Sequence, residues 1–219
     1  MLPNNNHKID AYIESLLCER NELLIEMEQL AKEQQVPIME LVGIETLLQL
    51  LRMKQPKSIL EIGTAIGYSA IRMAQAVDDV KIITIERDEP RYKQALEFVE
   101  RANVSDRVEI IFGDALHVGE QLELYAPFDV LFIDAAKGQY EKFFQIYEPL
   151  VRPGGLIISD NVLFRGLVAE EYIENKNHAG MAKKLRRYNE WLMKNEQFTT
   201  TILPVGDGIA LSIKKVKKV

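Results

Sequence analysis

From residue 58 onward, short apolar runs alternate with longer amphipathic stretches, and this rhythm limits the fold more than any other feature of the sequence. Between the runs, apolar side chains recur at the spacing of one helix face. Alternation of this kind is typical of β-α-β units, in which a parallel sheet is buried on both faces. The predicted strands are residues 58–62, 81–85, 108–112, 130–133 and 156–159, and the predicted helices are residues 68–76, 91–102 and 139–150.

The two ends of the chain differ from this middle part. Residues 1–56 have apolar side chains at helical spacing, which predicts N-terminal helices that pack on residues 57–219 as one structural unit. Pro153-Gly154-Gly155 predicts a turn into the fifth strand. After a polar helix near residues 179–194, the runs 198–203 and 209–213 flank Gly206-Asp207-Gly208 and predict an antiparallel hairpin at the sheet edge.

The composition is that of an ordinary globular protein, with 47% hydrophobic and 27% charged residues. The segment MLPNNNHKID lacks the cationic start and apolar core of a secretory signal, and no apolar run reaches the ~18 residues that a membrane helix needs. The single cysteine, Cys18, lies at an apolar-periodic position, which predicts a packed thiol. We therefore expect a cytoplasmic protein.

Charge is unevenly distributed along the chain. The net charge of −6 argues against a protein coated for nucleic acid. From Phe164 to the end, however, 11 Lys and Arg stand against 6 Asp and Glu. Such an asymmetry is a weak indication of a partner and is equally compatible with a solvated surface.

The stretch ILEIGTAIGYSA joins the first predicted strand to the first predicted helix. Gly63 and Gly67 allow the backbone to approach a ligand and leave N–H groups at the helix start free, although a tight turn would use glycines in the same way. Glu86 ends the second strand about twenty residues beyond the glycines, where nucleotide-binding folds hold a ribose. Asp114 follows the third strand at the same edge, and either acid could instead be a helix cap.

Two kinds of nucleotide cofactor fit this arrangement. A dinucleotide dehydrogenase also uses a ribose-binding acid, but its G-x-G-x-x-G loop has glycine where this chain has Ala65. The loop therefore favours an adenosine cofactor without a pyrophosphate, and S-adenosylmethionine meets that description.

Oxygen-bearing side chains also follow the fourth and fifth predicted strands, with Asp134 after the fourth and Asp160 and Asn161 after the fifth. Since neighbouring parallel strands end at one edge, these side chains are expected to meet, and two carboxylates with an amide oxygen suit Mg²⁺. Lys137 is placed to take a proton from a substrate hydroxyl or to stabilise its anion. The alternatives are a turn at Asp160-Asn161 and a surface lysine at Lys137.

With these motifs, the chain from Val36 to the C-terminus resembles the divalent-metal-dependent class I O-methyltransferases, which include catechol and caffeoyl-coenzyme A O-methyltransferases. The resemblance implies a Rossmann-like α/β fold with a seven-stranded, mostly parallel sheet and an antiparallel C-terminal hairpin. It also implies S-adenosylmethionine as methyl donor, Mg²⁺ or another divalent cation, and a homodimer. The implied cofactor-binding residues are Met39, Glu61, Gly63, Ala65, Ser69, Glu86, Asp114, Ala115 and Asp134; the implied metal ligands are Asp134, Asp160 and Asn161; and the implied catalytic residues are Lys137 and Asp134.

The motifs VPIME, FIDAAKGQY and PVGDG are similar to those of a bacterial subgroup that methylates 5-hydroxyuridine at the tRNA wobble position to 5-methoxyuridine. This resemblance implies a tRNA anticodon loop as partner. A catechol-type small molecule is the alternative acceptor, favoured by the acidic net charge, and both acceptors carry a hydroxyl beside a second oxygen. The candidate RNA-binding residues are Phe164, Arg165, Lys183, Lys184, Arg186 and Arg187.

Overall fold

The structure is a computed structural model and describes residues 6–216. The first five residues of the predicted segment 1–56 and the last three of the predicted segment 57–219 lie outside the described residues. Seven strands form one sheet in the order β3-β2-β1-β4-β5-β7-β6. The first five strands run parallel, and β7 is antiparallel to both β5 and β6, as the sequence predicted. The strands are β1 (Ser58–Ile62), β2 (Lys81–Glu86), β3 (Val108–Phe112), β4 (Phe128–Ile133), β5 (Val151–Ser159), β6 (Phe198–Leu203) and β7 (Ile209–Lys214).

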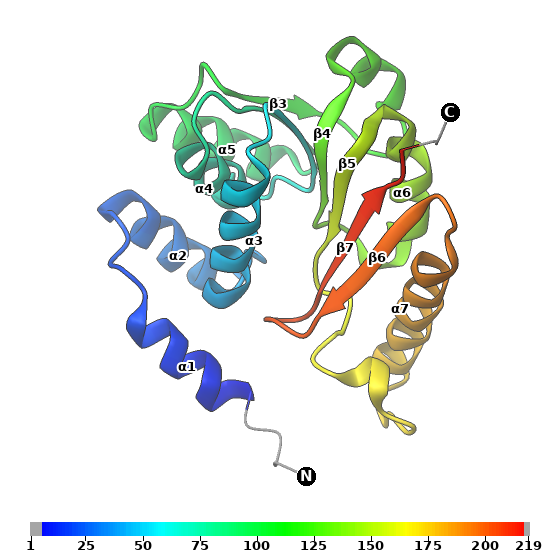
Figure 1. The fold of residues 1–219 in the computed structure, drawn as a ribbon. Helices are drawn as coiled ribbons and strands as arrows, with labels where there is room; N and C mark the ends of the chain where they lie inside the picture. The colour runs from blue at the N-terminus through cyan, green and yellow to red at the C-terminus, as the bar shows by residue number, and fades with distance from the viewer. Residues whose placement is uncertain (1–5, 217–219) are drawn as a thin grey trace.

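Helices cover both faces of the sheet (Figure 1). Successive residues of β1 show why the predicted strands are continuously apolar: Ile59 packs with α2, α3, α4 and α5, whereas Leu60 packs with α6 and α7 on the other face. Among residues 6–216, no helix combines the length and the apolar character that crossing a membrane requires. The helices are α1 (Asn6–Leu16), α2 (Glu22–Gln34), α3 (Leu41–Lys54), α4 (Tyr68–Ala76), α5 (Glu89–Arg101), α6 (Tyr140–Tyr147) and α7 (Lys176–Lys194).

Capping side chains fix where the helices begin. The Asp88 carboxylate accepts a hydrogen bond from the backbone N–H of Arg91 at 3.0 Å and so starts α5 directly after β2. Asn175 caps α7 in the same way, accepting from the backbone N–H groups of Asn177 and His178. Consequently α5 begins at the carboxyl edge of the sheet, close to Glu86.

Three local predictions were wrong. Pro153-Gly154-Gly155 is not a turn before the fifth strand but part of β5, whose pairing with β4 is irregular between Phe128 and Val130. The single helix predicted at residues 139–150 is instead α6 flanked by two short 3₁₀ turns, Lys137–Gln139 and Glu148–Leu150. Cys18 is exposed rather than packed, because α1 ends at Leu16 and the cysteine lies in the connection to α2.

Candidate active site

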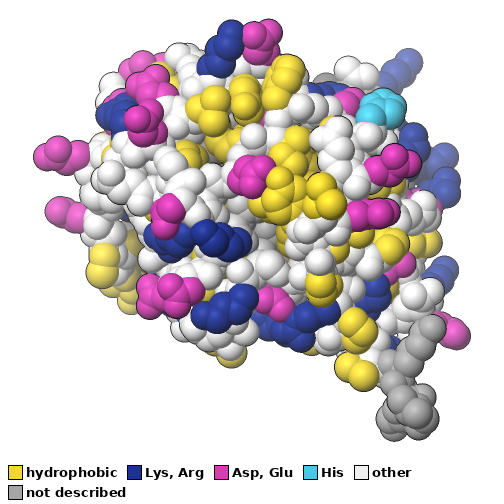
Figure 2. All heavy atoms as spheres, turned by 90° about the horizontal axis from the view of Figure 1, so that it is seen from above, with side chains coloured by type: hydrophobic (Ala, Val, Ile, Leu, Met, Phe, Trp, Pro, Cys, Tyr) yellow, Lys and Arg dark blue, Asp and Glu magenta, His cyan; other side chains and the backbone are white. Residues whose placement is uncertain are grey.

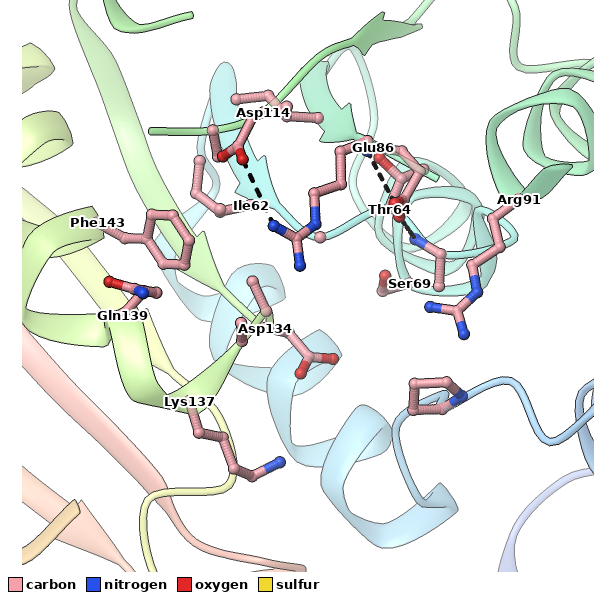
Figure 3. Close-up of a pocket in the computed structure, with 18 of the residues that line it drawn as sticks. Ile62, Thr64, Ser69, Glu86, Arg91, Asp114, Asp134, Lys137, Gln139 and Phe143 are labelled. Atoms are coloured by element: carbon pink, nitrogen blue, oxygen red, sulfur yellow. Dashed lines mark hydrogen bonds and ion pairs between the residues drawn. The ribbon is translucent and has the colours of Figure 1, made fainter. Parts of the chain in front are cut away.

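A cavity of about 420 Å³ lies at the carboxyl ends of β1, β2, β3 and β4 (Figure 3). This is the edge at which open parallel sheets hold their ligands. The segment before α3 forms one wall with Pro37, Ile38 and Met39. Of the nine predicted cofactor-binding residues, all but Glu61 line the cavity.

Gly63 is required where the β1–α4 loop passes the end of β4. Its φ of +104° is left-handed, and a Cβ at this position would lie 2.0 Å from the backbone oxygen of Asp134. Gly67 has a φ of +86° and begins α4, whereas Ala65 between them adopts a φ of +48° without being glycine. The loop therefore brings bare backbone against the residue that follows β4.

Glu86 holds this loop from the next strand. One carboxylate oxygen accepts from the backbone N–H of Ala65 at 2.8 Å, and the other accepts from the N–H groups of Arg87 and Asp88, each at 2.8 Å. The side chain is buried and lines the cavity. Glu86 thus fixes the glycine loop and presents a carboxylate where a ribose-binding acid was predicted.

Glu61 lies behind the cavity wall and is fully buried. Its carboxylate accepts from the hydroxyls of Ser69 and Thr84, each at 2.5 Å. Burial raises the pKa of Glu61 to about 7, although both hydroxyl donors oppose the shift. Ser69 lines the cavity, but its hydroxyl donates to Glu61 and is therefore not free to donate to a cofactor.

Asp114 occupies the end of β3. Its carboxylate accepts from the backbone N–H of Leu116 at 2.9 Å and pairs with the Arg87 guanidinium at 3.4 Å. The N–H of Leu116 and the charge of Arg87 hold the pKa of Asp114 below its usual value, despite partial burial. Figure 3 shows this ion pair crossing the upper part of the cavity.

Side chains that follow β4 and β5 lie close together. Backbone hydrogen bonds of 3.0 Å tie the N–H of Asp134 to β1 and the N–H of Asp160 to β4. The Asn161 amide donates to the Asp160 carboxylate at 3.0 Å, and the Lys137 ammonium donates to the Asn161 side-chain oxygen at 2.7 Å. Burial raises the pKa values of Asp134 and Asp160, and the charge of Asp134 adds to the rise at Asp160.

This set of side chains suits a hard divalent cation. Two buried carboxylates repel one another, and an added positive charge would offset that repulsion. Within residues 6–216, no three His, Cys, Asp or Glu side chains are grouped as a metal site, so the third ligand at this point would be the amide oxygen of Asn161. That oxygen accepts from Lys137, which would have to share or release it.

The predicted RNA-binding residues differ in their surroundings. Lys183, Lys184 and Arg187 are exposed on α7. Phe164 packs edge-to-face against His178, with ring centroids 5.6 Å apart. Arg186 differs from these neighbours because its guanidinium is engaged inside the protein, and its assignment to RNA stays a prediction. It donates to the backbone carbonyls of residues 167, 168 and 170, with distances of 2.7 Å to residue 168 and 3.1 Å to residue 167.

Several cavity residues were missed by the sequence analysis. Arg91 directs its guanidinium into the cavity from the first turn of α5, and Phe143 lines the opposite side from α6 (Figure 3). Gln139 also lines the cavity, and its side-chain oxygen is buried without a hydrogen-bond partner. All three follow a strand that ends at the cavity, and this position could have indicated a role in the site. Their residue types, however, have no pattern that distinguishes cavity residues from other helix residues.

Comparisons with known proteins agree with this geometry. A sequence profile described as O-methyltransferase matches residues 14–215. A catechol O-methyltransferase of Niastella koreensis is 37% identical, with 94% of this chain and 96% of the relative covered. An O-methyltransferase of Bacillus cereus, solved in complex with SAH (S-adenosylhomocysteine), has a TM-score of 0.82 at 30% identity and covers 95% of this chain and 97% of its own. A Staphylococcus aureus structure provisionally named a caffeoyl-CoA O-methyltransferase has a TM-score of 0.87 at 40% identity, with coverages of 94% and 98%. The chain belongs to the O-methyltransferase family.

Proposed function

We propose that the protein transfers the methyl group of S-adenosylmethionine to a hydroxyl that has a second oxygen on the neighbouring carbon. The observation that carries this proposal is the chain of contacts from Lys137 through Asn161 to Asp160, at a cavity that Asp134 also lines. A neighbouring structure contains SAH, the product of that donor, on the same fold. The relative from Niastella koreensis is named for a catechol, which has two adjacent hydroxyls.

The cofactor pocket has one feature for each part of this donor. Glu86 would bind the two ribose hydroxyls, and the segment from Gly113 to Leu116, which lines the same cavity, would lie against the adenine. Gly63 and Ala65 bring the backbone close enough to contact the methionine half. When bound, S-adenosylmethionine supplies an electrophilic methyl group and a divalent cation supplies positive charge for two adjacent acceptor oxygens.

The protein's own residues prepare the acceptor. Asp134, Asp160 and Asn161 would hold the cation, and the walls of the cavity orient the acceptor relative to the donor, which supplies much of the rate advantage in such reactions. Lys137 reaches the same place from the turn after β4. Its ammonium stabilises the ionised acceptor oxygen, the form that attacks a methyl group.

A catechol-type small molecule is the first candidate acceptor. The named relatives with printed substrates include catechol and caffeoyl-CoA O-methyltransferases. The net charge of −6 also fits a small acceptor better than a large anionic one. On the face shown in Figure 2, which lies at the amino ends of the parallel strands, Lys and Arg side chains are interspersed with Asp and Glu.

The second candidate is 5-hydroxyuridine at the wobble position of tRNA, whose 5-hydroxyl is adjacent to the C4 carbonyl. The observation that favours it is the exposed basic group Lys183, Lys184 and Arg187 on α7. A Cβ at Gly138, next to Lys137, would lie 3.4 Å from the Lys184 ammonium, so this basic group extends to the turn that carries Lys137. A phosphate backbone could bind there while a base enters the site.

One experiment tests the function and separates the acceptors. The protein is incubated with methyl-labelled S-adenosylmethionine and Mg²⁺, together with either a catechol panel or tRNA that contains 5-hydroxyuridine. Label in catechols alone supports the first candidate, and label in tRNA alone supports the second. Label in neither, from protein that still binds SAH, would contradict both.

A further inference from the structure

The Gly206-Asp207-Gly208 tip of the β6–β7 hairpin lies against the segment that follows β5. The backbone N–H of Val162 donates to the carbonyl of Gly208 at 3.0 Å, and the N–H of Leu163 donates to the carbonyl of Asp207 at 2.9 Å. A third donor, the backbone N–H of Arg165, binds the Asp207 carboxylate itself. These contacts connect residues about forty positions apart in the sequence, immediately after Asp160 and Asn161.

The segment held in this way is strained. Asn161, Phe164 and Arg165 have φ angles of +53°, +49° and +55°, and Gly166 follows with +80°. Left-handed angles are unfavourable for most residues other than glycine, so several in succession persist only where the surroundings impose them. The segment therefore needs outside contacts to keep Asn161 and Phe164 where they are.

The segment is fastened on two sides. From α7, the Asn189 amide donates to the carbonyl of Val162 at 2.9 Å, and Arg186 binds the carbonyls of the turn at residues 167–170. From the hairpin tip, Gly208 packs so closely that a Cβ would lie 2.3 Å from the Leu163 side chain. Asp207 is the only side chain of the tip that can reach the segment, since both of its neighbours are glycines.

The hairpin tip also packs against α3. A Cβ at Gly206 would lie 3.5 Å from the Cα of Gly43, in the first turn of α3 directly after the segment that carries Met39. One short turn thus contacts both the start of α3 and the segment that follows Asn161.

We propose that Asp207 is a positioning residue, which fixes the left-handed segment 161–166 through its carboxylate and so orients Asn161 and Phe164 toward the acceptor. The effect on the acceptor rests on the proposed function, whereas the anchoring of segment 161–166 by the Asp207 carboxylate does not depend on it. Without the carboxylate acceptor, the N–H of Arg165 loses its partner and the strained segment relaxes.

Hydrogen–deuterium exchange tests this anchoring without any acceptor. In Asp207→Ala, backbone N–H groups of residues 161–169 should exchange roughly tenfold faster than in the wild type, since a hydrogen bond to a charged group is lost. Asp207→Asn keeps an oxygen acceptor and should exchange within about twofold of wild type on the same reasoning. The matched control is Asp78→Ala, which removes an exposed aspartate elsewhere.

The affinity for SAH, measured by calorimetry, should stay within about twofold of wild type in both Asp207 variants, because the anchoring acts on the acceptor side. With an accepted substrate, Asp207→Ala should raise KM and lower kcat, and Asp207→Asn should restore both. Equal exchange in Asp207→Ala and wild type would overturn the proposal, as would exchange in Asp207→Asn as fast as in Asp207→Ala. If Asp207→Ala does not fold, Asp207→Ser, whose oxygen is one bond too short, replaces it under the same criteria. Failure of the proposed function alone would leave the exchange pattern intact.

Discussion

The ammonium of Lys137 donates to the side-chain oxygen of Asn161 at 2.7 Å, joining the turn after β4 to the end of β5. Asn161 in turn donates to the Asp160 carboxylate, so the ammonium, the amide and the carboxylate form one chain of hydrogen bonds. Asp134, whose pKa the Lys137 charge lowers against the effect of burial, completes the group. The proposed chemistry therefore involves side chains from two adjacent strand ends rather than one residue.

Replacing Lys137 with methionine should lower kcat by roughly a hundredfold or more, the range typical of a lost group that moves or stabilises a proton. The affinity for SAH should change by less than about threefold, because the ammonium faces the acceptor side. Lys142→Met, which removes an exposed lysine from α6, is the control. Calorimetry and initial rates measure the two effects, and a full rate in Lys137→Met would refute the assigned role.

Replacing Glu86 with glutamine should weaken binding of SAH by roughly tenfold or more, since hydrogen bonds to charged groups contribute about 1.5–3 kcal/mol. The carboxylate accepts three backbone hydrogen bonds, and an amide nitrogen would face one of those donors. Glu89→Gln changes an exposed glutamate three positions later and should have no effect on SAH. Equal affinities in the two variants, measured by calorimetry, would remove Glu86 from the cofactor site.

Stability should fall as pH rises from about 4.5 to about 7, because the pKa of Glu61 is raised from 4.5 to about 7 in the folded protein. Across this range the folded state keeps a proton that the unfolded state has lost, so stabilisation is complete below the unfolded pKa and disappears above the folded one. The change from Glu61 is roughly 3 kcal/mol. Buried Asp134 and Asp160 add to it in the same direction.

Urea unfolding at a series of pH values, without cofactor or divalent cation, measures this slope. Glu61→Gln should flatten it, since the amide does not titrate, while the part due to the two aspartates remains. An unchanged slope in Glu61→Gln would show that Glu61 is ionised in the folded protein throughout the range.

The N-terminal helices are the surface through which we expect a homodimer. Ile9, Tyr12 and Leu16 recur on one face of α1 and are 54%, 64% and 65% exposed. Burying such a face would stabilise a dimer by the hydrophobic effect. The double variant Ile9→Glu and Leu16→Glu should elute as a monomer in light-scattering chromatography, with Met53→Glu as the control; a wild type that is already monomeric would contradict the expectation.

Much of the fold was predictable because short continuous apolar runs mark the buried strands and apolar residues at helical spacing mark the helices. The bounds of β1, β3, α4 and β6 agree with the residues predicted from the sequence. The placement of Asp134, Asp160 and Asn161 at one edge of the sheet was predictable for a topological reason, since neighbouring parallel strands end at the same edge. Such arguments need only local pattern and connectivity.

Other features depend on contacts that no local pattern contains. Arg186 has the same sequence context as its basic neighbours, yet its guanidinium is used to hold backbone carbonyls of the β5–α7 connection. Glu61 interrupts an apolar strand, and the sequence does not show whether its side chain faces the cavity or lies behind Ser69, as it does in the structure. The Gly-Asp-Gly turn was predicted as a hairpin, but its packing against residues 162–165 is a tertiary relationship.

A titration with Mn²⁺, monitored by the electron paramagnetic resonance signal of the free ion, tests most directly whether the protein has the proposed cation site. We predict one site per chain in the wild type and none of comparable affinity in Asp160→Ala, with SAH affinity retained in both proteins. A wild type that binds no Mn²⁺, or an Asp160→Ala variant that binds it as tightly as the wild type does, would contradict the cation site on which the proposed chemistry depends.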